Sequence, residues 1–254
     1  MRLLQRDLEV LKALDKLRVL DINLISSLVG INEGTCKNRM RKLVTEGYVK
    51  YYQESKTTKR YYTVTKKGMA YLYPPRITIS KSGKIYKKVK KAPTINKRTL
   101  DHEIKVAEVL NHILRFNDNL SIDDFKTERD MQRKMEYMQI RNQHICDLLC
   151  EKYKIKMEVE LSVKQKNKLS RNIIFNTSNY VQIWFVNSDM LYKRLLDEKK
   201  YLEEKYLIKI IKLNNICDAD LDLSSYYKEI NEKFGVISTE KKEMYQQMNI
   251  FEIK

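Results

Sequence analysis

The sequence predicts an α+β protein with two domains of different character, and three observations support this prediction. Residues 33–65 combine the spacing of an amphipathic helix with two short strand-like runs that follow it. From residue 99 onwards, helical and strand-like segments alternate as in an α/β domain. The formal net charge of +17 is carried entirely by the N-terminal part. At 254 residues, the chain is long enough for one large or two modest domains with sizeable cores.

Residues 33–47 have the spacing of an amphipathic helix. Their apolar side chains fall at i, i+4, i+7 and i+8 and form one stripe, at Cys36, Met40, Leu43 and Val44. The remaining surface carries basic and hydrogen-bonding side chains at Thr35, Lys37, Asn38, Arg39, Arg41 and Lys42. The next two runs, YVKYYQ and RYYTVT, are rich in tyrosine and valine and are joined by the basic loop 54–59, so they predict a hairpin.

Two further helices are predicted upstream. The leucines between residues 8 and 17 line the first helix, and Asp21 is a suitable N-cap for a second, short helix that ends at Gly30. Asn32 is placed to cap the helix at 33–47. This order predicts a winged helix-turn-helix, in which the recognition helix enters the DNA major groove and the wing touches the backbone or minor groove. The alternative is a three-helix bundle whose solvated basic face contacts only proteins.

The distribution of charge indicates a polyanionic partner. Residues 1–98 contain 24 Lys and Arg against 7 Asp and Glu, whereas the 26 basic and 26 acidic residues that follow cancel. Between residues 55 and 100 there are 14 basic residues and no acidic one. Lysines and arginines near phosphates release condensed counterions, so double-stranded DNA is the expected partner. With no apolar run of the ~18 to 20 residues that a spanning helix needs, and no secretory signal, we expect a cytoplasmic protein without a membrane partner.

Within this interface, two side chains are the best candidates for reading bases. Arginine can bind guanine, and asparagine adenine, through paired hydrogen bonds, which favours Arg39 and Asn38. The lysines of the helix and the wing residues Lys56, Lys59 and Arg60 are expected to hold phosphates. DNA binding of this kind requires no cofactor. Winged-helix proteins often bind paired half-sites, so a homodimer is expected by analogy.

Three domains or segments follow from these patterns. The winged helix-turn-helix is predicted to occupy residues 1–73, where a short helix through Met69 ends before Pro74. Residues 74–98 form a basic linker or a small hairpin around Ser82 and Gly83. The α/β domain covers residues 99–254. Its helices are predicted at 100–114, 163–176, 190–205 and 226–234, and its strands near 122–128, 144–150, 155–162, 180–186 and 207–213.

Acidic residues gather on two neighbouring predicted strands. Asp147 lies in the run HICDLLC, and the period of two puts Glu158 and Glu160 on one face of the next strand. Such carboxylates, with a nearby lysine, are the groups that hold Mg²⁺ and activate water against a phosphodiester. Order and spacing are similar to the PD-(D/E)xK nucleases. On that resemblance Asp147, Glu158 and Lys164 would be catalytic, and Asp147, Glu158 and Glu160 would hold the metal.

The sequence also departs from the nuclease pattern. Glu160 stands where the motif aligned on Glu158 has its lysine, and Cys146 stands where proline is preferred. Lys164 or Lys166, from the following helix, would have to substitute. Three interpretations therefore remain open: a polar face on an exposed strand, a metal-binding but inert remnant, and a working nuclease. Cys146, Cys150 and His144 lack two further zinc ligands at suitable spacing and are expected to be reduced thiols and an unrelated histidine.

Taken together, the winged helix, the basic linker, the run LDHEIKVAEVL and the junction EVELSxK at 158–164 resemble the replication-relaxation family of plasmids and conjugative elements. The resemblance covers residues 1–186. It implies DNA binding linked to plasmid replication or to relaxosome-type processing, in a Gram-positive host, with replication or relaxosome proteins as further partners. Two alternatives stay open: a Mg²⁺-dependent DNA endonuclease, and a transcription repressor whose C-terminal domain senses a peptide or another protein, or dimerises.

Overall fold

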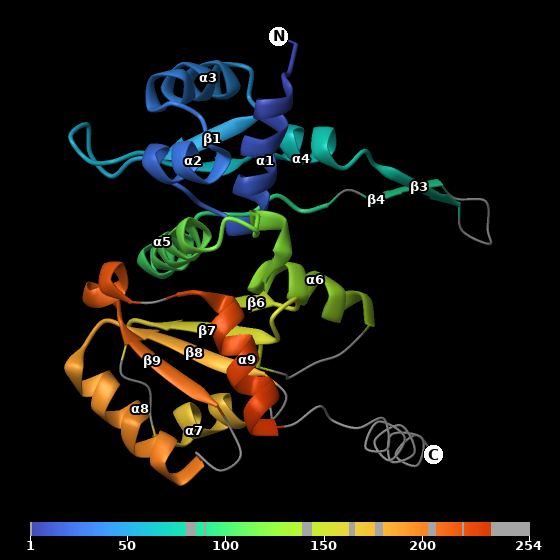
Figure 1. Ribbon diagram of the computed structural model, residues 1–254. Coiled ribbons are helices and arrows are strands. Elements are labelled where there is room, and N and C mark those ends of the chain that lie inside the picture. Colours follow the sequence, from blue (N-terminus) through green and yellow to red (C-terminus); the bar gives the residue numbers. More distant parts are fainter. Residues whose placement is uncertain are drawn as a thin grey trace. The chain divides into compact units, whose positions relative to one another are not determined.

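The computed structural model describes residues 2–79, 85–88, 90–138, 144–162, 166–175, 180–202, 207–219 and 221–234. The chain forms two compact units, Met1–Arg141 and Asn142–Lys254 (Figure 1). The described residues combine helices with antiparallel and mixed sheets, which confirms the α+β class.

The first unit begins with the predicted helix-turn-helix. The Asp21 carboxylate accepts a hydrogen bond from the amide of Leu24 at 2.9 Å, and the Asn32 side chain accepts one from Gly34 at 2.8 Å, so both predicted N-caps are confirmed. Gly30 ends the second helix with φ of 67°, a left-handed conformation that glycine adopts without steric cost. The three helices are α1 (Gln5–Leu17), α2 (Ile22–Val29) and α3 (Glu33–Thr45).

Two hairpins follow the three helices. Strands β1 (Val49–Tyr52) and β2 (Tyr61–Val64) pair antiparallel and form the predicted wing. After α4 (Lys66–Leu72), strands β3 (Arg76–Ile79) and β4 (Ile85–Lys88) form a second antiparallel hairpin. The described part of residues 74–98 therefore contains a hairpin, which was one of the two predicted alternatives for this stretch.

The apolar stripe of α3 packs into the core of the winged helix, as its spacing predicts. Cys36, Met40 and Leu43 are all buried, and Val44 is half-buried. Other fully buried side chains of the module come from α1, α2, α4, β2 and the turn between α1 and α2, at Leu11, Leu14, Leu20, Ile25, Val64 and Met69. Burial of this stripe leaves the opposite, basic face of α3 in solvent.

Gly68 lies in a tightly packed part of this module. A Cβ at this position would lie 2.5 Å from the Tyr48 carbonyl oxygen and 2.5 Å from Val64 Cγ2. We expect Gly68→Ala to lower the free energy of unfolding by about 2 to 3 kcal/mol in urea denaturation, because backbone must move to admit the methyl group. Gly30→Ala is the control: its Cβ meets nothing within 4 Å, so only the positive φ costs about 1 kcal/mol. Equal losses would contradict the packing explanation.

The first unit extends beyond the winged helix. Helix α5 (Leu100–Phe116), the 3-10 turn η1 (Ile122–Asp124), strand β5 (Phe125–Thr127) and helix α6 (Glu128–Met138) belong to it. This compact unit therefore crosses the boundary predicted at residues 98–99, because α5 and α6 pack on α1 and α2. The sequence also predicted a strand over 122–128 where only 125–127 are extended, and it did not predict α6.

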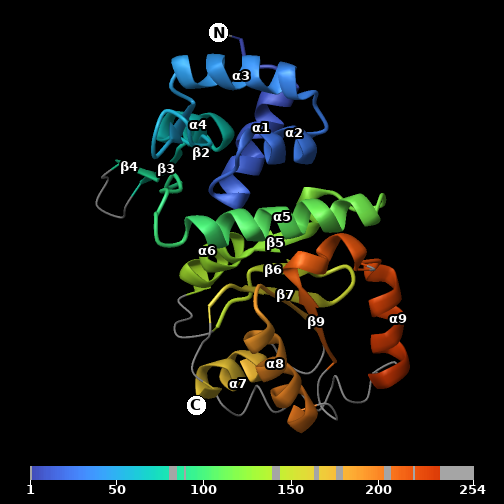
Figure 2. The same cartoon turned by 90° about the vertical axis from the view of Figure 1, so that its left-hand side faces the viewer.

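The second unit is built on a mixed sheet. Strands β6 (Leu148–Cys150) and β7 (Ile155–Glu160) pair antiparallel, whereas β7 pairs parallel with β8 (Val181–Val186), and β8 with β9 (Ile208–Lys212). Figure 2 shows helices α7 (Lys166–Phe175) and α8 (Asp189–Leu202) together on one side of the sheet. They cover it with apolar side chains around Trp184, which is fully buried.

The remaining elements complete the second unit. The 3-10 turn η2 (Leu213–Asp218) follows β9, and helix α9 (Leu223–Phe234) packs near β8. The helices that the sequence predicted at 163–176, 190–205 and 226–234 are present within their described ranges. None of the helices in the described part of the chain is long and apolar enough to cross a membrane.

Candidate nucleic-acid interface

The solvent-facing side of α3 carries most of the predicted DNA-contacting residues. Lys37, Asn38, Arg41 and Lys42 are exposed, and Thr35 is half-buried at the start of the helix. Lys37 pairs with Glu33 one turn earlier, where both side chains are about half exposed, so this pair contributes little to stability and leaves the lysine available. The face is therefore positioned as a recognition helix requires.

Arg39, in contrast, turns toward the protein. Its Nε donates to Asp7 Oδ1 at 2.8 Å, and its Nη2 pairs with Asp7 Oδ2. Asp7 is fully buried on α1 and also accepts the Leu4 amide at 2.7 Å. The hydrogen bonds that Arg39 donates to the Asp7 carboxylate raise the pKa of Arg39 above its usual value. Arg39 thus anchors α3 on α1, and this geometry does not favour the base-reading role that the sequence predicts for it.

The wing has an ordered loop that leaves its cations in solvent. The Gln53 side chain amide donates to the carbonyl oxygens of Lys56 at 3.2 Å and Thr58 at 2.8 Å, and its Oε1 accepts Arg60 Nε at 3.0 Å. These bonds hold the loop through its backbone. Lys56, Lys59 and Arg60 are all exposed, as phosphate-binding residues must be.

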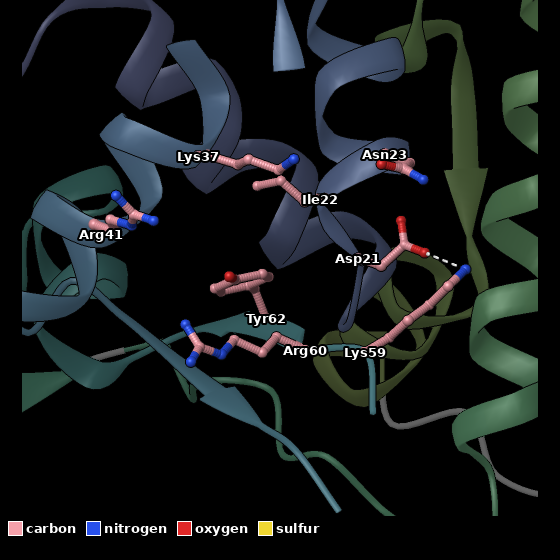
Figure 3. A pocket seen from close by; sticks show the side chains of 8 residues that line it. All are labelled: Asp21, Ile22, Asn23, Lys37, Arg41, Lys59, Arg60 and Tyr62. Carbon is pink, nitrogen blue, oxygen red and sulfur yellow. Dashed lines mark hydrogen bonds and ion pairs between the residues drawn. The ribbon is translucent and has the colours of Figure 1, made fainter. Parts of the chain in front are cut away.

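A pocket of about 290 Å³ lies where α2, α3 and the wing meet (Figure 3). Cationic side chains reach it from two elements, Lys37 and Arg41 from α3, and Lys59 and Arg60 from the wing. Figure 3 shows the guanidinium groups of Arg41 and Arg60 on the same side of the Tyr62 ring. The other residues that line the pocket are Asp21, Ile22, Asn23 and Tyr62.

The electrostatics of this pocket favour an anion. Lys59 Nζ lies 3.5 Å from Asp21 Oδ2, but its side chain is 69% exposed, so the pair is weak and exchangeable. Arg60 stacks over the Tyr51 ring, 4.8 Å from its centroid, which fixes the guanidinium beside the pocket. Burial raises the pKa of Tyr62, which keeps its hydroxyl protonated as a donor. The sequence did not single out Asn23 or Tyr62, because no local pattern shows which side chains meet across three elements.

Asp147, Glu158 and Glu160, the carboxylates of the predicted metal site, contact different groups of the protein. Asp147 Oδ2 accepts the Val159 amide at 2.7 Å. Glu158 Oε1 lies 2.6 Å from His144 Nε2. Glu160 Oε1 accepts the amide and the hydroxyl of Ser162, both at 3.3 Å. Each carboxylate is therefore directed to a different protein group.

The burial of β7 tests one of the three interpretations given for Glu158 and Glu160. Glu158 and Glu160 are each only 4% exposed, so the interpretation as the polar face of an exposed strand is wrong: β7 is an inner strand, covered on both faces. Among the described residues, no group of three or more His, Cys, Asp or Glu side chains could hold a metal ion. Lys164 lies outside the described residues.

The cysteines agree with the prediction of reduced thiols. None of the four cysteines forms a disulfide: Cys36, Cys146 and Cys150 are buried, and Cys217 is exposed. Burial raises the pKa of the Cys146 thiol far above its usual value, and the nearby Glu158 adds to that shift. A thiol of this kind stays protonated and unreactive at neutral pH.

Comparison with known proteins identifies a family for one part of the chain, the N-terminal residues 3–50. The sequence model of a family described as winged helix-turn-helix DNA-binding matches residues 3–50, which span α1 to α3 and the first residues of β1. No curated protein and no solved structure gives a significant match. The family match, the capped helices and the wing agree with one another, and the N-terminal part of the chain is a winged helix-turn-helix DNA-binding domain.

Proposed function

We propose that the chain is a sequence-specific, double-stranded DNA-binding protein of a plasmid or conjugative element, acting in its replication or transfer. The observation that carries the DNA-binding part is the continuous basic surface from α3 across the pocket to the wing, in a domain whose family binds DNA. The link to replication and transfer rests on the resemblance of residues 1–186 to the replication-relaxation family. A cytoplasmic location is part of the same proposal, because the DNA of such an element lies in the cytoplasm.

The exposed face of α3 suggests which side chains read bases. Asn38 and Arg41 are both exposed one turn apart, so Arg41 takes the role that the sequence assigned to Arg39. Each can form paired hydrogen bonds with one purine in the major groove. Thr35 and Lys42 flank them on the same helix. The wing residues Lys56, Lys59 and Arg60 then bind the phosphate backbone.

The pocket suggests where one backbone phosphate is held. A backbone phosphate there would meet Arg41 and Arg60, and it would compete with the Asp21 carboxylate for Lys59, whose pair with Asp21 is exposed and weak. Asn23 adds a neutral donor at the start of α2. We propose that the protein binds as a homodimer on paired half-sites, with the second unit providing the surface for dimerisation or for replication or relaxosome proteins.

Selection of duplexes from a random pool, followed by titration over a range of salt concentrations, tests the function. We expect the selected duplex to bind roughly 10³-fold or more tightly than random DNA, with affinity falling with salt by a log–log slope of about −0.9 per phosphate neutralised. Sites in an origin or transfer region support the proposed process. Sites in promoters would make the protein a repressor instead, and equal binding to every duplex would contradict sequence-specific recognition.

Cleavage is the competing function, since the order and spacing of Asp147, Glu158 and Lys164 in the sequence are similar to the PD-(D/E)xK nucleases. We expect no cleavage by the wild type in Mg²⁺ or Mn²⁺, because Asp147, Glu158 and Glu160 are directed to different protein groups. Asp147→Ala should leave DNA affinity unchanged and lower the free energy of unfolding by about 1 to 3 kcal/mol, because the Val159 amide loses a charged acceptor. Metal-dependent nicking that Asp147→Ala abolishes would establish the endonuclease.

A further inference from the structure

The turn between α1 and α2 has an unusual backbone. Arg18 adopts φ of 64° and ψ of −49°, and the amide of Val19 donates to the Leu17 carbonyl at 2.7 Å. These values describe a γ-turn with positive φ, which is rare and strained for a residue that carries a Cβ. Such a conformation persists only where the surrounding structure holds it in place.

The Arg18 side chain supplies that restraint. Its Nη1 donates to Glu103 Oε1 on α5 at 2.7 Å, and its Nη2 donates to Glu128 Oε2 on α6 at 3.0 Å. The Gln132 side chain fixes Glu128 by donating to its other oxygen at 2.7 Å. Only 23% of the arginine side chain is exposed, so these charged bonds are partly shielded from solvent. We refer to Arg18, Glu103, Glu128 and Gln132 as the Arg18 clamp.

The residues that follow Arg18 lead directly to the DNA-facing pocket. Leu20 and Tyr62 form an isolated β-bridge, with the Leu20 amide donating at 3.1 Å and the Tyr62 amide at 2.8 Å. Asp21, the next residue, caps α2 and contacts Lys59. The strained turn therefore lies two to three residues from the groups that set the position of α2 and β2 around the pocket.

We propose that Arg18 is a positioning residue for DNA binding: through the clamp, α5 and α6 hold the turn that places α2 and the wing around the basic pocket. The inference rests on the proposed function. It makes α5 and α6 part of the DNA-binding unit, although they lie outside the helix-turn-helix sequence. Arg18 acts through the backbone of residues 18–21 and does not itself contact DNA.

Replacing Glu103 and Glu128 by glutamine distinguishes a positioning role of the Arg18 clamp from a purely electrostatic effect on DNA binding. Removing negative charge from a DNA-binding protein strengthens its attraction to DNA, so a purely electrostatic role predicts tighter binding by Glu103→Gln with Glu128→Gln. The clamp predicts the opposite sign, with affinity for the selected duplex falling about 5-fold or more. The matched control is Glu108→Gln on α5, whose carboxylate pairs with Lys105 where both side chains are more than 40% exposed. It should bind as tightly as the wild type or slightly more tightly.

A second pair of variants isolates the backbone. Arg18→Ala and Arg18→Gly remove the same charge and the same side chain, but only glycine adopts a positive φ without strain. We expect Arg18→Gly to retain an affinity about threefold or more above that of Arg18→Ala. All variants are made in the full chain, and unfolding curves establish that each is folded at the titration temperature.

Hydrogen exchange at the Leu20 and Tyr62 amides gives a readout that does not depend on DNA. The clamp predicts that exchange at both amides accelerates about 10-fold in Glu103→Gln with Glu128→Gln, and remains unchanged in Glu108→Gln. If the wild type fails to bind any duplex, the proposed function fails, and the positioning role fails with it even where exchange accelerates. If the wild type binds but the clamp variants bind equally or more tightly, or exchange does not change, the positioning role alone is overturned.

Discussion

Replacing Lys37 and Arg41 together by glutamate lowers the affinity for the selected duplex by about 100-fold or more. Both side chains are exposed on α3, and both line the pocket between α3 and the wing. Loss of one specific arginine contact costs about 1 to 3 kcal/mol, and reversal of two charges adds repulsion from the phosphates. Fluorescence anisotropy titration at fixed salt measures the effect. Stability should change little, because the Lys37–Glu33 pair is exposed.

The control for this variant carries the same change in charge elsewhere. Lys168 and Arg171 are exposed on α7 in the second unit, so Lys168→Glu with Arg171→Glu also replaces one lysine and one arginine on one helix. We expect this control to lose less than about 5-fold in affinity, through long-range electrostatics alone. An equal loss in both double variants would show that net charge, and not the face of α3, determines binding.

Asp15→Asn lowers the free energy of unfolding by about 3 kcal/mol at pH 7. Asp15 is 2% exposed on α1 and accepts Nη1 and Nη2 of Arg133 at 3.0 and 2.7 Å, with Arg129 Nε at 3.3 Å. Removing one partner of a buried ion pair leaves the others without compensation, which is strongly destabilising. Burial acts to raise the pKa of Asp15, but the two arginines outweigh it and hold that pKa below its usual value. Urea denaturation measures the loss.

The pH dependence follows from that lowered pKa. A carboxyl group whose pKa is lower in the folded state contributes stability above its unfolded pKa, and loses it as pH falls through the folded value. The difference between wild type and Asp15→Asn should therefore shrink below about pH 4. Asp123→Asn is the control, since its carboxylate is 77% exposed and lies 3.8 Å from Lys16, and it should cost less than about 0.5 kcal/mol. A constant difference from pH 7 to pH 3 would contradict the ion-pair explanation.

Local patterns predicted the winged helix because local physics determines most of it. The spacing of Cys36, Met40 and Leu43 fixes the buried face of α3, and the capping residues fix where the helices begin. The tyrosine- and valine-rich runs likewise define the wing. The sequence did not predict helix α6 because the helix has few apolar residues. Its arginines, Arg129 and Arg133, pair with Asp15 on α1, and no local pattern indicates that contact.

Long-range pairing determines the features that the sequence did not show. Arg39 lies on the border of the buried stripe, and nothing near it in the chain indicates that Asp7 would bind it. The same holds for Arg18, whose partners are 85 and 110 residues away. Strand periodicity correctly places Glu158 and Glu160 on one face, but it cannot show that helices α7 and α8 cover that face.

Lysine acetylation of the full chain, with and without the selected duplex, tests the central claim most directly. Mass spectrometry then measures which amines DNA protects. If α3 and the wing form the interface, the duplex protects Lys37, Lys42, Lys56 and Lys59, whereas exposed lysines of the second unit such as Lys152, Lys168 and Lys193 are acetylated as before. Protection confined to the second unit, or absent from α3 and the wing, would contradict the proposed interface.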